Sequence, residues 1–455
     1  MYIYDSFSRS KRKFKNEGKV NMYYCGPTVY DDIHLGNALS AVRADLIRRF
    51  LIAKGYKVKF VANWTDIDDK MIDRAALKKI KVSELAAEVI PQIEDVYNKL
   101  NVLPVDQRMF ATRSMNEIFE MVKILLSRDV AYKISDGIYF DVSKFEAYGQ
   151  LSNQDLSALE AGTRVDVNDE KRNPQDFVLW KHAKPNEPIF KDSESIVPDG
   201  RPGWHIECSA MNYIAFGGET VDIHLGGIDL KFPHHECEIA QSEACFGNKF
   251  VDFWCHNGYL LTDGEKMSKS LNNFKYAKDL FLEFNPLDLR FFLLATHYRA
   301  PLEFTLKAMQ AASNARYKLQ NFYAYIFKTT ASKDSSETLL SSIKEAKQLF
   351  FDAMEDDFQI SKALSHIFDL IHLVFHKDDY TKSELGALQE FLTEINLVLG
   401  VFKTDLQIPV YVLDLAKKRY EARLNKDYAT SDKLRMEIHN LGYQVRDNQD
   451  CYEVY

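Results

Sequence analysis

The sequence predicts an α/β fold, a doubly wound parallel sheet with an insertion, followed by an all-α helical bundle and a small C-terminal domain. A buried strand-like run from Val20 to Cys25 precedes an amphipathic helix pattern, and an alternating strand follows at 57–63. A strand, a helix and a second strand in this order indicate a parallel sheet. After Asn285 the strand signals fade, and apolar positions at helical spacing predict successive helices.

Length and composition are those of an ordinary globular chain. Its 455 residues, 46% hydrophobic and 27% charged, exceed what one core accommodates, so we expect roughly two to four domains. The 6 cysteines show no paired framework and no apolar signal segment opens the sequence, which favours the cytoplasm. No run approaches the about 18 apolar residues of a membrane span, so we expect no membrane role. The net charge of -8 argues against indiscriminate coating of nucleic acid but permits basic patches at 9–15 and 417–426.

Changes of pattern along the chain predict the domain boundaries. From about Leu103 the strand-helix rhythm gives way to mixed elements and a polar stretch, and the sheet resumes at Asp222 and Asp252. The acidic run 355–357 is expected to be a solvated helix end. The predicted segments are the first half of a nucleotide-binding fold at 1–104, a connective insertion at 105–200, the second half of that fold at 201–262, a loop region at 263–304, a helical bundle at 305–402 and a small C-terminal domain at 403–455.

One stretch carries candidate metal ligands. Cys208 offers a soft thiolate, and His234 and Glu238 are four residues apart, so a helix beginning near Pro233 would place both on one face. Zinc accepts all three ligand types. Cys25 ends the first predicted strand, and ligands of doubly wound sheets bind at the carboxyl ends of strands, so Cys25 is the best-placed fourth ligand. Because a lone cysteine or histidine is more often an interior packing residue, the spacing alone leaves both interpretations open.

Two short motifs have chemistry suited to a nucleoside triphosphate. HLGN places His34 and Asn37 at a strand-to-helix turn, where free amides and the helix dipole favour phosphate and Gly36 permits close approach. A His-Leu-Gly tripeptide is common and carries little weight alone. KMSKS carries Lys266 and Lys269, two ammonium groups that can neutralise charge as pyrophosphate leaves.

The two motifs together resemble the signature pair of class I aminoacyl-tRNA synthetases. Six longer motifs then resemble the cysteinyl-tRNA synthetases, in this order and over most of the chain: YYCGPTVYDDIHLGN, NWTDIDDKMIDRA, RPGWHIECSAMN, GGIDLKFPHHECEIAQSE, GEKMSKSLNNF and RFFLLATHYRAPLEF. The terminal segment KKRYEARLNKDYATSDKLRMEIHNLGY is similar to that family's C-terminus. The resemblance implies a Rossmann-like class I synthetase core.

The resemblance also implies an activity and its partners. A cysteine–tRNA ligase activates L-cysteine with ATP to cysteinyl-adenylate and pyrophosphate, then transfers cysteine to the 3′-terminal adenosine of tRNA(Cys) for protein synthesis. It implies one Zn2+ per chain, Mg2+ with ATP, and a cytoplasmic monomer. The segment 263–304 would carry the KMSKS loop and contact the tRNA stem, 305–402 would bind tRNA, and 403–455 would bind the anticodon.

The family resemblance also implies roles for the residues of this chain that match the family's motifs. The resemblance assigns zinc to Cys25, Cys208, His234 and Glu238, and the cysteine pocket to Gly26, Thr65, Trp204 and His224. It assigns ATP contacts to His34, Gly36, Asn37, Gly226, Gly227, Asp229, Lys266 and Lys269, with catalytic roles for His34, Asn37, Lys266 and Lys269. Trp204 could equally be a packing residue. Asp66, Asp68 and Asp69 are expected to cap a helix, and His205 and Glu207 to support the neighbouring ligands without binding metal.

The sequence departs from the family pattern in places. Asn37 stands where many class I enzymes have histidine, so we expect it to bind and not to act as an acid or base. Cys237 lies near the helical face of His234 and could compete with Glu238; the match by position favours Glu238, because a third protein thiolate would make zinc less Lewis acidic. The terminal NQDCYEVY lacks the family pattern, so no base contact is assigned there.

Two other functions remain open from the sequence. A related ligase could join activated cysteine to a small amine instead of tRNA, and a zinc-stabilised RNA-binding protein would do no chemistry. The long helical region after Asn285 and the basic terminal segment favour a tRNA substrate over a small amine. Lys266 and Lys269 favour an enzyme over a binding protein, because a binding protein has no need of a paired-lysine loop.

Overall fold

The structure is a computed structural model that describes most of the chain. Outside the description lie residues 16–17, 154–168, 263, 268–273, 333–338, 376, 378, 405–407, 409, 441–442, 444, 448–450 and 455, and the side chains of residues 266, 439, 440, 446 and 453. Among the described residues, no helix combines the length and the apolar character needed to cross a membrane.

A five-stranded parallel sheet forms the centre of the α/β part. Its strands lie in the order β11-β10-β3-β4-β5, and each neighbouring pair is parallel, so the predicted doubly wound sheet is confirmed. The strands are β3 (Lys19–Tyr24), β4 (Lys57–Trp64), β5 (Gln107–Phe110), β10 (Val221–Gly227) and β11 (Val251–Asn257). β5 lies inside the range 105–200 that we predicted as an insertion, so the parallel sheet extends past that boundary.

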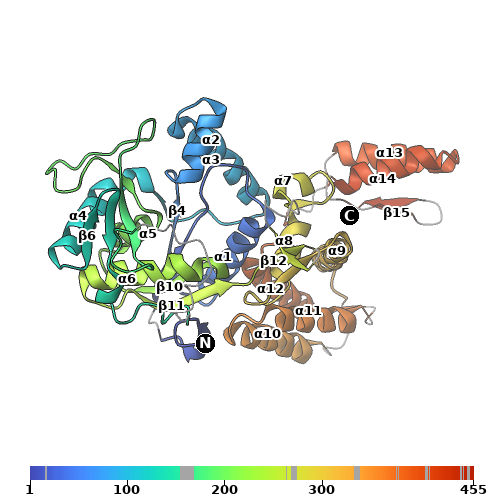
Figure 1. Cartoon of the computed structure of the whole chain (residues 1–455). Coiled ribbons are helices and arrows are strands. Elements are labelled where there is room, and N and C mark those ends of the chain that lie inside the picture. The colour runs from blue at the N-terminus through green and yellow to red at the C-terminus, as the bar shows by residue number, and fades with distance from the viewer. Residues whose placement is uncertain are drawn as a thin grey trace.

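Helices cover both faces of this sheet (Figure 1). They are α1 (Leu35–Ala53), α2 (Asp69–Lys78), α3 (Val82–Lys99), α4 (Met115–Ser127), α5 (Trp204–Phe216) and α6 (Glu236–Phe246). Side chains alternate along β3, so Met22 and Tyr24 join the core with α1 and α3, whereas Tyr23 and Cys25 join the core with α5 and α6. This alternation directs Cys25 toward the helices that carry the other predicted metal ligands.

An antiparallel sheet interrupts the parallel one in sequence. It contains β6 (Ala131–Ile134), β7 (Gly137–Phe140), β8 (Phe177–His182) and β9 (Gly200–Pro202), which pair in this order. It lies at the left of Figure 1. At the other end of the α/β part, β1 (Tyr2–Asp5) and β2 (Ser10–Lys13) form a hairpin that packs beside β11.

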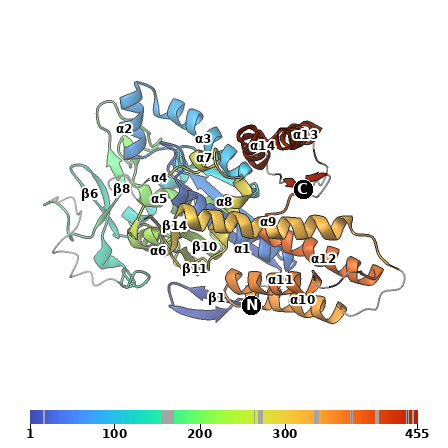
Figure 2. The ribbon, with the colours of Figure 1, turned by 90° about the vertical axis from the view of Figure 1, so that its right-hand side faces the viewer.

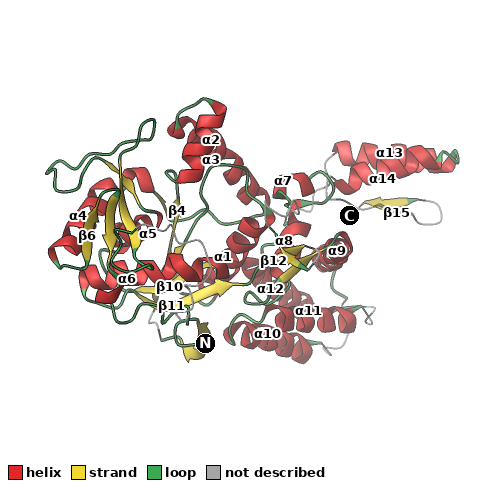
Figure 3. Ribbon diagram, viewed as in Figure 1, coloured by secondary structure: helices red, strands yellow, loops and turns green. Residues whose placement is uncertain are grey.

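The chain after β11 is mostly helical, as Figure 3 shows. A small sheet of β12 (Leu260–Thr262), β13 (Glu265–Lys266) and β14 (Leu302–Phe304) leads into it. The helices are α7 (Ala277–Leu280), α8 (Pro286–Leu294), α9 (Leu306–Lys328), α10 (Leu340–Glu355), α11 (Ile360–Val374), α12 (Lys382–Leu399), α13 (Val410–Leu424) and α14 (Tyr428–Asn440). β15 (Val445–Asp447) and β16 (Tyr452–Val454) complete the C-terminal unit, which projects from the body in Figures 1 and 2.

A buried ionic group, which we name the arginine cluster, joins α1 to α8. It consists of Asp45, Arg49 and Arg290. Asp45 Oδ2 lies 2.6 Å from Arg290 Nη2 and 2.7 Å from Arg49 Nε. The same guanidinium groups donate to the backbone oxygens of Leu399, Leu100 and Asn101. The end of α12 is thereby fixed to the helix that begins with HLGN.

The acidic run 355–357 is not wholly a solvated helix end, contrary to our prediction. Asp357 is 0% exposed and lies 2.6 Å from Arg299 Nη2. It also accepts hydrogen bonds from the backbone N of Tyr4 and the hydroxyl of Tyr298, each at 2.9 Å. The β1–β2 hairpin thus meets the helical part at this carboxylate, a contact between residues 353 apart that no local pattern reveals.

Candidate active site

Four predicted ligands meet in one buried group, which we name the metal cluster: Cys25, Cys208, His234 and Glu238. Cys25 follows β3, Cys208 lies in α5, His234 lies in a π-helical turn (Lys231–His235), and Glu238 lies in the first turn of α6. The four ligand atoms all lie within 4.8 Å of one another. Cys25 Sγ is 3.7 Å from Cys208 Sγ and 3.4 Å from Glu238 Oε1.

These distances fit a tetrahedral ion. With Zn–S about 2.3 Å and Zn–N about 2.0–2.1 Å, tetrahedral geometry separates two sulfurs by roughly 3.8 Å and sulfur from nitrogen by roughly 3.5 Å. Cys25 Sγ lies 3.7 Å from both Cys208 Sγ and His234 Nε2. His234 Nε2 lies 3.0 Å from Glu238 Oε1, as the four-residue spacing predicted. Two thiolates, an imidazole and a carboxylate therefore suit a zinc-like ion.

The electrostatics of the cluster favour a cation at its centre. Burial raises the pKa of the Cys25 thiol, and the hydrogen bond from Cys25 lowers the pKa of Cys208 to about 7. Burial opposes protonation of His234, but the charges of Cys208 and Glu238 raise its pKa to about 10. Burial also opposes ionisation of Glu238, yet His224 and His234 lower its pKa to about 2. The cluster thus concentrates anionic donors around one point, away from water.

A second possible ligand set shares two members with the first: Cys25, His224, His235 and Glu238. His224 is fully buried, and its Nε2 lies 3.0 Å from Glu238 Oε2. His235 Nδ1 is 2.8 Å from His256 Nε2, so it already has a partner. Sequence analysis did not single out His235, although the paired histidines of PHHECE were a visible signal. We favour the first set, because it contains both thiolates.

The neighbours of the cluster answer two open questions. Cys237 Sγ lies 3.6 Å from the Tyr148 hydroxyl and belongs to neither ligand set, so it is not placed to compete with Glu238. His205 Nδ1 lies 2.9 Å from His234 Nδ1, which matches the predicted supporting role. With His234 Nε2 facing the cluster, we assign its Nδ1–H as the donor to His205.

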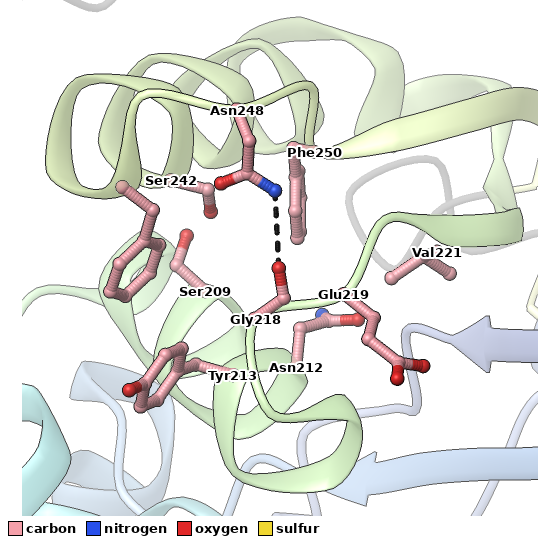
Figure 4. A pocket seen from close by; sticks show the side chains of 10 residues that line it. Ser209, Asn212, Tyr213, Gly218, Glu219, Val221, Ser242, Asn248 and Phe250 are labelled. Atoms are coloured by element: carbon pink, nitrogen blue, oxygen red, sulfur yellow. Dashed lines mark hydrogen bonds between the residues drawn. The ribbon is translucent and has the colours of Figure 1, made fainter.

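Polar contacts behind the cluster position its helices. Asn212 Nδ2 donates to the backbone oxygen of Cys208 at 2.8 Å, one turn along α5. Figure 4 shows the small cavity of about 20 Å³ between α5 and α6, where Asn248 Nδ2 donates to the backbone oxygen of Gly218 at 3.1 Å. A cavity of this size holds about one water.

A cleft of about 230 Å³ opens beside the metal cluster at the ends of the strands. His34 caps α1, because its Nδ1 accepts from the backbone N of Asn37 at 3.3 Å. At Gly36, a Cβ atom would come within 2.9 Å of the His34 ring. Eight residues predicted for the site line this cleft: Cys25, Gly26, His34, Gly36, Asn37, Trp204, Gly227 and Asp229. Thr65, His224 and Gly226 do not line it.

Some predicted pocket residues support it from behind. Thr65 is buried, and its hydroxyl accepts from Asn63 Nδ2 at 3.2 Å, while Asn63 Oδ1 accepts from the backbone N of Gly26 at 2.9 Å. Trp204 is 38% exposed, and its ring lies 4.4 Å from that of His234, so it contacts a cluster residue and also lines the cleft.

The three aspartates after Thr65 have separate structural roles. Asp68 caps α2 by accepting from the backbone N of Lys70 at 2.6 Å, as predicted. Asp66 does not cap α2 and instead accepts from the backbone N of Thr112 at 2.9 Å. Asp69, the first residue of α2, pairs with Lys181 at 2.6 Å and so ties α2 to the antiparallel sheet.

The side chains of the two KMSKS lysines are not among those that the structure describes. Lys269 lies outside the described residues, and so does the side chain of Lys266, whose backbone pairs with β12 in β13. Met267, which lies between them, is buried and lines the cleft. The described part of the motif therefore reaches the cleft that contains His34.

Comparison with known proteins agrees with this geometry. A family model described as the catalytic domain of class I (C) tRNA synthetases matches residues 11–314, and a DALR domain model matches 349–403. A relative from Caldicellulosiruptor saccharolyticus, named cysteine–tRNA ligase, is 39% identical over 460 residues, and the match covers 98% of each chain. One of the same name from Methanococcus maripaludis is 41% identical over 465 residues and covers 98% of this chain and 97% of the relative.

A solved structure supports the fold. Methionyl-tRNA synthetase from Mycobacterium tuberculosis, in complex with methionyl-adenylate, is 14% identical, with a TM-score of 0.58, and covers 84% of this chain and 89% of that one. At this identity the likeness concerns architecture alone. Two findings show the family: the match to the catalytic-domain model, and relatives about two fifths identical over nearly the whole length. The chain belongs to the cysteine–tRNA ligase family of class I tRNA synthetases.

Proposed function

We propose that this chain is a cysteine–tRNA ligase, which activates L-cysteine with ATP and transfers it to the 3′-terminal adenosine of tRNA(Cys). The observation that carries the proposal is the position of the metal cluster. Two thiolates, an imidazole and a carboxylate converge beside the cleft that His34 and Asn37 line, at the carboxyl ends of the strands. An amino acid held at the cluster would therefore lie next to a nucleotide held in the cleft.

Selection of cysteine over serine is the task that we assign to the metal cluster. A zinc ion held by Cys25, Cys208, His234 and Glu238 would offer a soft Lewis acid, which prefers the substrate thiolate to a serine hydroxyl. A pocket that reads only size and polarity discriminates such near-isosteres modestly, by about 10- to 200-fold. Gly26, Thr65, Trp204 and His224 shape the pocket around the amino acid.

In the activation step, the cysteine carboxylate attacks the α-phosphorus of ATP and pyrophosphate leaves. His34 and Asn37 donate to the phosphates at the start of α1, and Gly36 lets the chain approach closely. Lys266 and Lys269 neutralise the charge that develops on pyrophosphate, and Mg2+ accompanies ATP. Gly226, Gly227 and Asp229 hold the adenosine. Asn37 is a neutral donor, so its role is to bind.

In the transfer step, a ribose hydroxyl of the terminal adenosine attacks the acyl carbon and AMP leaves. We assign 263–304 to the stem, 305–402 to tRNA binding and 403–455 to the anticodon. Exposed cations on α13 and the turn after it support the last assignment: Lys417, Lys418 and Lys426, together with exposed Arg423, whose Nε lies 3.3 Å from Asp447 Oδ2. Arg419, in the same predicted patch, is buried and pairs with Asp447, so it is not available to phosphate. We expect a cytoplasmic monomer.

The experiment that tests the proposal is ATP–pyrophosphate exchange with cysteine and with serine, on protein whose zinc has been counted, followed by acylation of tRNA(Cys). We expect exchange with cysteine only, loss of exchange when zinc is stripped, and charging of the tRNA. Exchange without charging would identify a ligase with another acceptor. The absence of any exchange would contradict the enzyme itself.

A further inference from the structure

A second cavity lies on the α1 and α3 side of the sheet, apart from the metal cluster. It has a volume of about 360 Å³ and lies against β4 and β5. Its floor is buried and apolar: Tyr24, Ala41, Phe60 and Ala62. Its rim is exposed and includes Glu94, Asn98 and Pro104, so solvent reaches the cavity. Tyr24 also lines the cleft of the candidate active site and forms a wall common to both.

Among the described residues, two buried hydrogen-bond donors without an acceptor lie at or directly behind this cavity: Tyr97 lines it, and Trp64 stacks on Tyr97. Tyr97 is 7% exposed, and its buried hydroxyl finds no acceptor among the described residues, although the Tyr24 hydroxyl is near enough to act on it as a donor. The ring of Trp64 stacks on Tyr97 with centroids 6.1 Å apart, and its buried indole N–H also lacks a partner. Buried donors of this kind are rare in folded proteins, because each one unpaired costs about 1–3 kcal/mol.

A guanidinium group stands beside these donors. Arg108 lines the cavity, and its Cζ lies 4.0 Å from the centroid of the Trp64 ring. Among the described residues, no carboxylate lies within ion-pair distance of Arg108, whereas buried Arg290 and Arg316 both have aspartate partners. Glu94 acts on Arg108 by its charge from the rim without pairing with it. An arginine that stacks on an aromatic ring and whose guanidinium N–H groups pair with no carboxylate is suited to bind an anion.

We propose that this cavity binds a small organic carboxylate with an apolar or aromatic body. The carboxylate accepts from the Arg108 guanidinium and the Tyr97 hydroxyl, and the apolar body lies against Tyr24 and Phe60. A single cation and mostly apolar walls favour one negative charge over the two of a phosphate. The carboxylate of Glu94 on the rim disfavours a dianion further. None of the residues to which we assign a role in the tRNA ligase reaction lines this cavity, so the ligand would be an additional one.

Binding of 3-phenylpropionate to the zinc-loaded full-length chain tests the proposal by calorimetry. Phenethylamine has the same ring with an ammonium group, and inorganic phosphate has the charge without a ring. We expect saturable binding of one 3-phenylpropionate per chain and weaker or undetectable binding of the other two. Binding should persist when a non-reactive cysteinyl-adenylate analogue fills the active site. Loss of binding with the analogue would place the probe in the active site and overturn the proposal.

Variants locate the site. Arg108→Gln should weaken binding of 3-phenylpropionate by at least about tenfold, because a hydrogen-bonded charge partner is lost. Arg113→Gln is the matched control, since Arg113 lies 4.1 Å over the Phe110 ring but does not line this cavity, and it should bind as the unaltered chain does. Equal binding by the Arg108 variant and this control would overturn the proposal.

Tyr97→Phe supplies an independent test in case Arg108→Gln does not fold. It removes a buried hydroxyl that finds no acceptor among the described residues, so the thermal unfolding midpoint without ligand should stay unchanged or rise. Binding of 3-phenylpropionate should nevertheless weaken by about fivefold. Unchanged binding, or a lower unfolding midpoint without ligand, would show that the hydroxyl serves the fold and not a ligand.

Discussion

The metal cluster and the arginine cluster are both buried groups of ionisable side chains, but they differ in how their polar atoms find partners. In the arginine cluster, Arg290 donates to Asp45, to the Leu399 oxygen and to the Leu100 oxygen, and Arg49 donates to Asp45 and to the Asn101 oxygen. Donors and acceptors are matched within the chain. The metal cluster instead brings together four electron-pair donors. Cys25 Sγ lies 3.4–3.7 Å from the donor atoms of Cys208, His234 and Glu238.

The difference shows how a buried polar group can be classified. Charged side chains are costly to bury unless they are paired, so a buried charged group calls for a partner. Where the chain itself supplies the partners, the group fixes the fold, as between α1, α8 and α12. Where the side chains are all potential ligands of one centre, as in the metal cluster, the group is suited to hold a cation and is a candidate functional site.

The largest effect that we expect is on stability, from a substitution in the arginine cluster. Replacing Arg290 with Met should lower the free energy of unfolding in urea by about 3–5 kcal/mol, because Asp45 and three backbone oxygens, those of Leu399, Leu100 and Asn101, lose a buried donor. Zinc content should remain one per chain in the protein that folds. Arg113→Met, an exposed control, should change stability by less than about 0.5 kcal/mol. If Arg290→Met lost zinc without losing stability, the distinction between the clusters would fail.

The next effect is on activity. Cys208→Ala should abolish stoichiometric zinc and slow cysteine-dependent pyrophosphate exchange by more than about 100-fold, because loss of a ligand exceeds the 10- to 100-fold expected for loss of a ligand's supporting partner. Elemental analysis and exchange kinetics measure the two quantities. Cys237→Ala is the matched control: its thiol contacts Tyr148 and not the cluster, so zinc should be retained. Zinc lost from the Cys237 variant would assign the ligands differently.

A smaller effect is expected from the residue that supports a ligand. His205→Ala removes the acceptor 2.9 Å from His234 Nδ1, so zinc affinity should fall by about 10- to 100-fold as His234 loses its fixed orientation. Competition with a metal chelator measures the affinity. His182→Ala, which alters a half-buried histidine on β8 that is not part of the metal cluster, should leave the affinity unchanged. Equal affinities in the two variants would show that the contact between His205 and His234 is incidental.

The smallest effect depends on pH and concerns Asp357. Burial opposes its ionisation, but hydrogen bonds from His297, Tyr4 and Arg299 lower its pKa below the ordinary value. The unfolded chain therefore binds the proton more tightly, so the stabilisation is complete above about pH 4 and is lost as pH falls through the folded pKa. Free energies of unfolding at pH 7 and pH 3.5 should show the advantage of the unaltered chain over Asp357→Asn shrinking by no more than about 0.7 kcal/mol, the limit that an unfolded pKa of about 3.9 sets. A constant difference would contradict the lowered pKa.

Much of the fold could be predicted because its signals are local. The run to Cys25, the stripe of α1 and the alternation of 57–63 each specify an element within a few residues, and parallel pairing follows from their order. The position of β5 could not be predicted in this way. It has only four residues, and its membership of the sheet rests on pairing with β4, nearly fifty residues earlier.

The ligand set could be predicted in part from spacing and in full only from the family resemblance. The four-residue interval between His234 and Glu238 specifies their common face, and the structure brings them to 3.0 Å. Cys25 and Cys208 are 183 residues apart, and no local rule connects them. The family resemblance also could not exclude Cys237 from the candidate ligand set. The structure does so, because the Cys237 thiol contacts the Tyr148 hydroxyl and not the metal cluster.

The sequence by itself determined which elements form and which kinds of ligand are present, because periodicity, turn residues and side-chain chemistry act over short distances. Tertiary structure alone decided which buried groups are completed within the chain. Asp357 is an interior ion-pair partner because the β1–β2 hairpin contacts it. Packing of α3 on the sheet leaves the Tyr97 hydroxyl without an acceptor among the described residues, and none of their carboxylates pairs with Arg108. Completion of a buried polar group depends on long-range packing, which no local segment of sequence encodes.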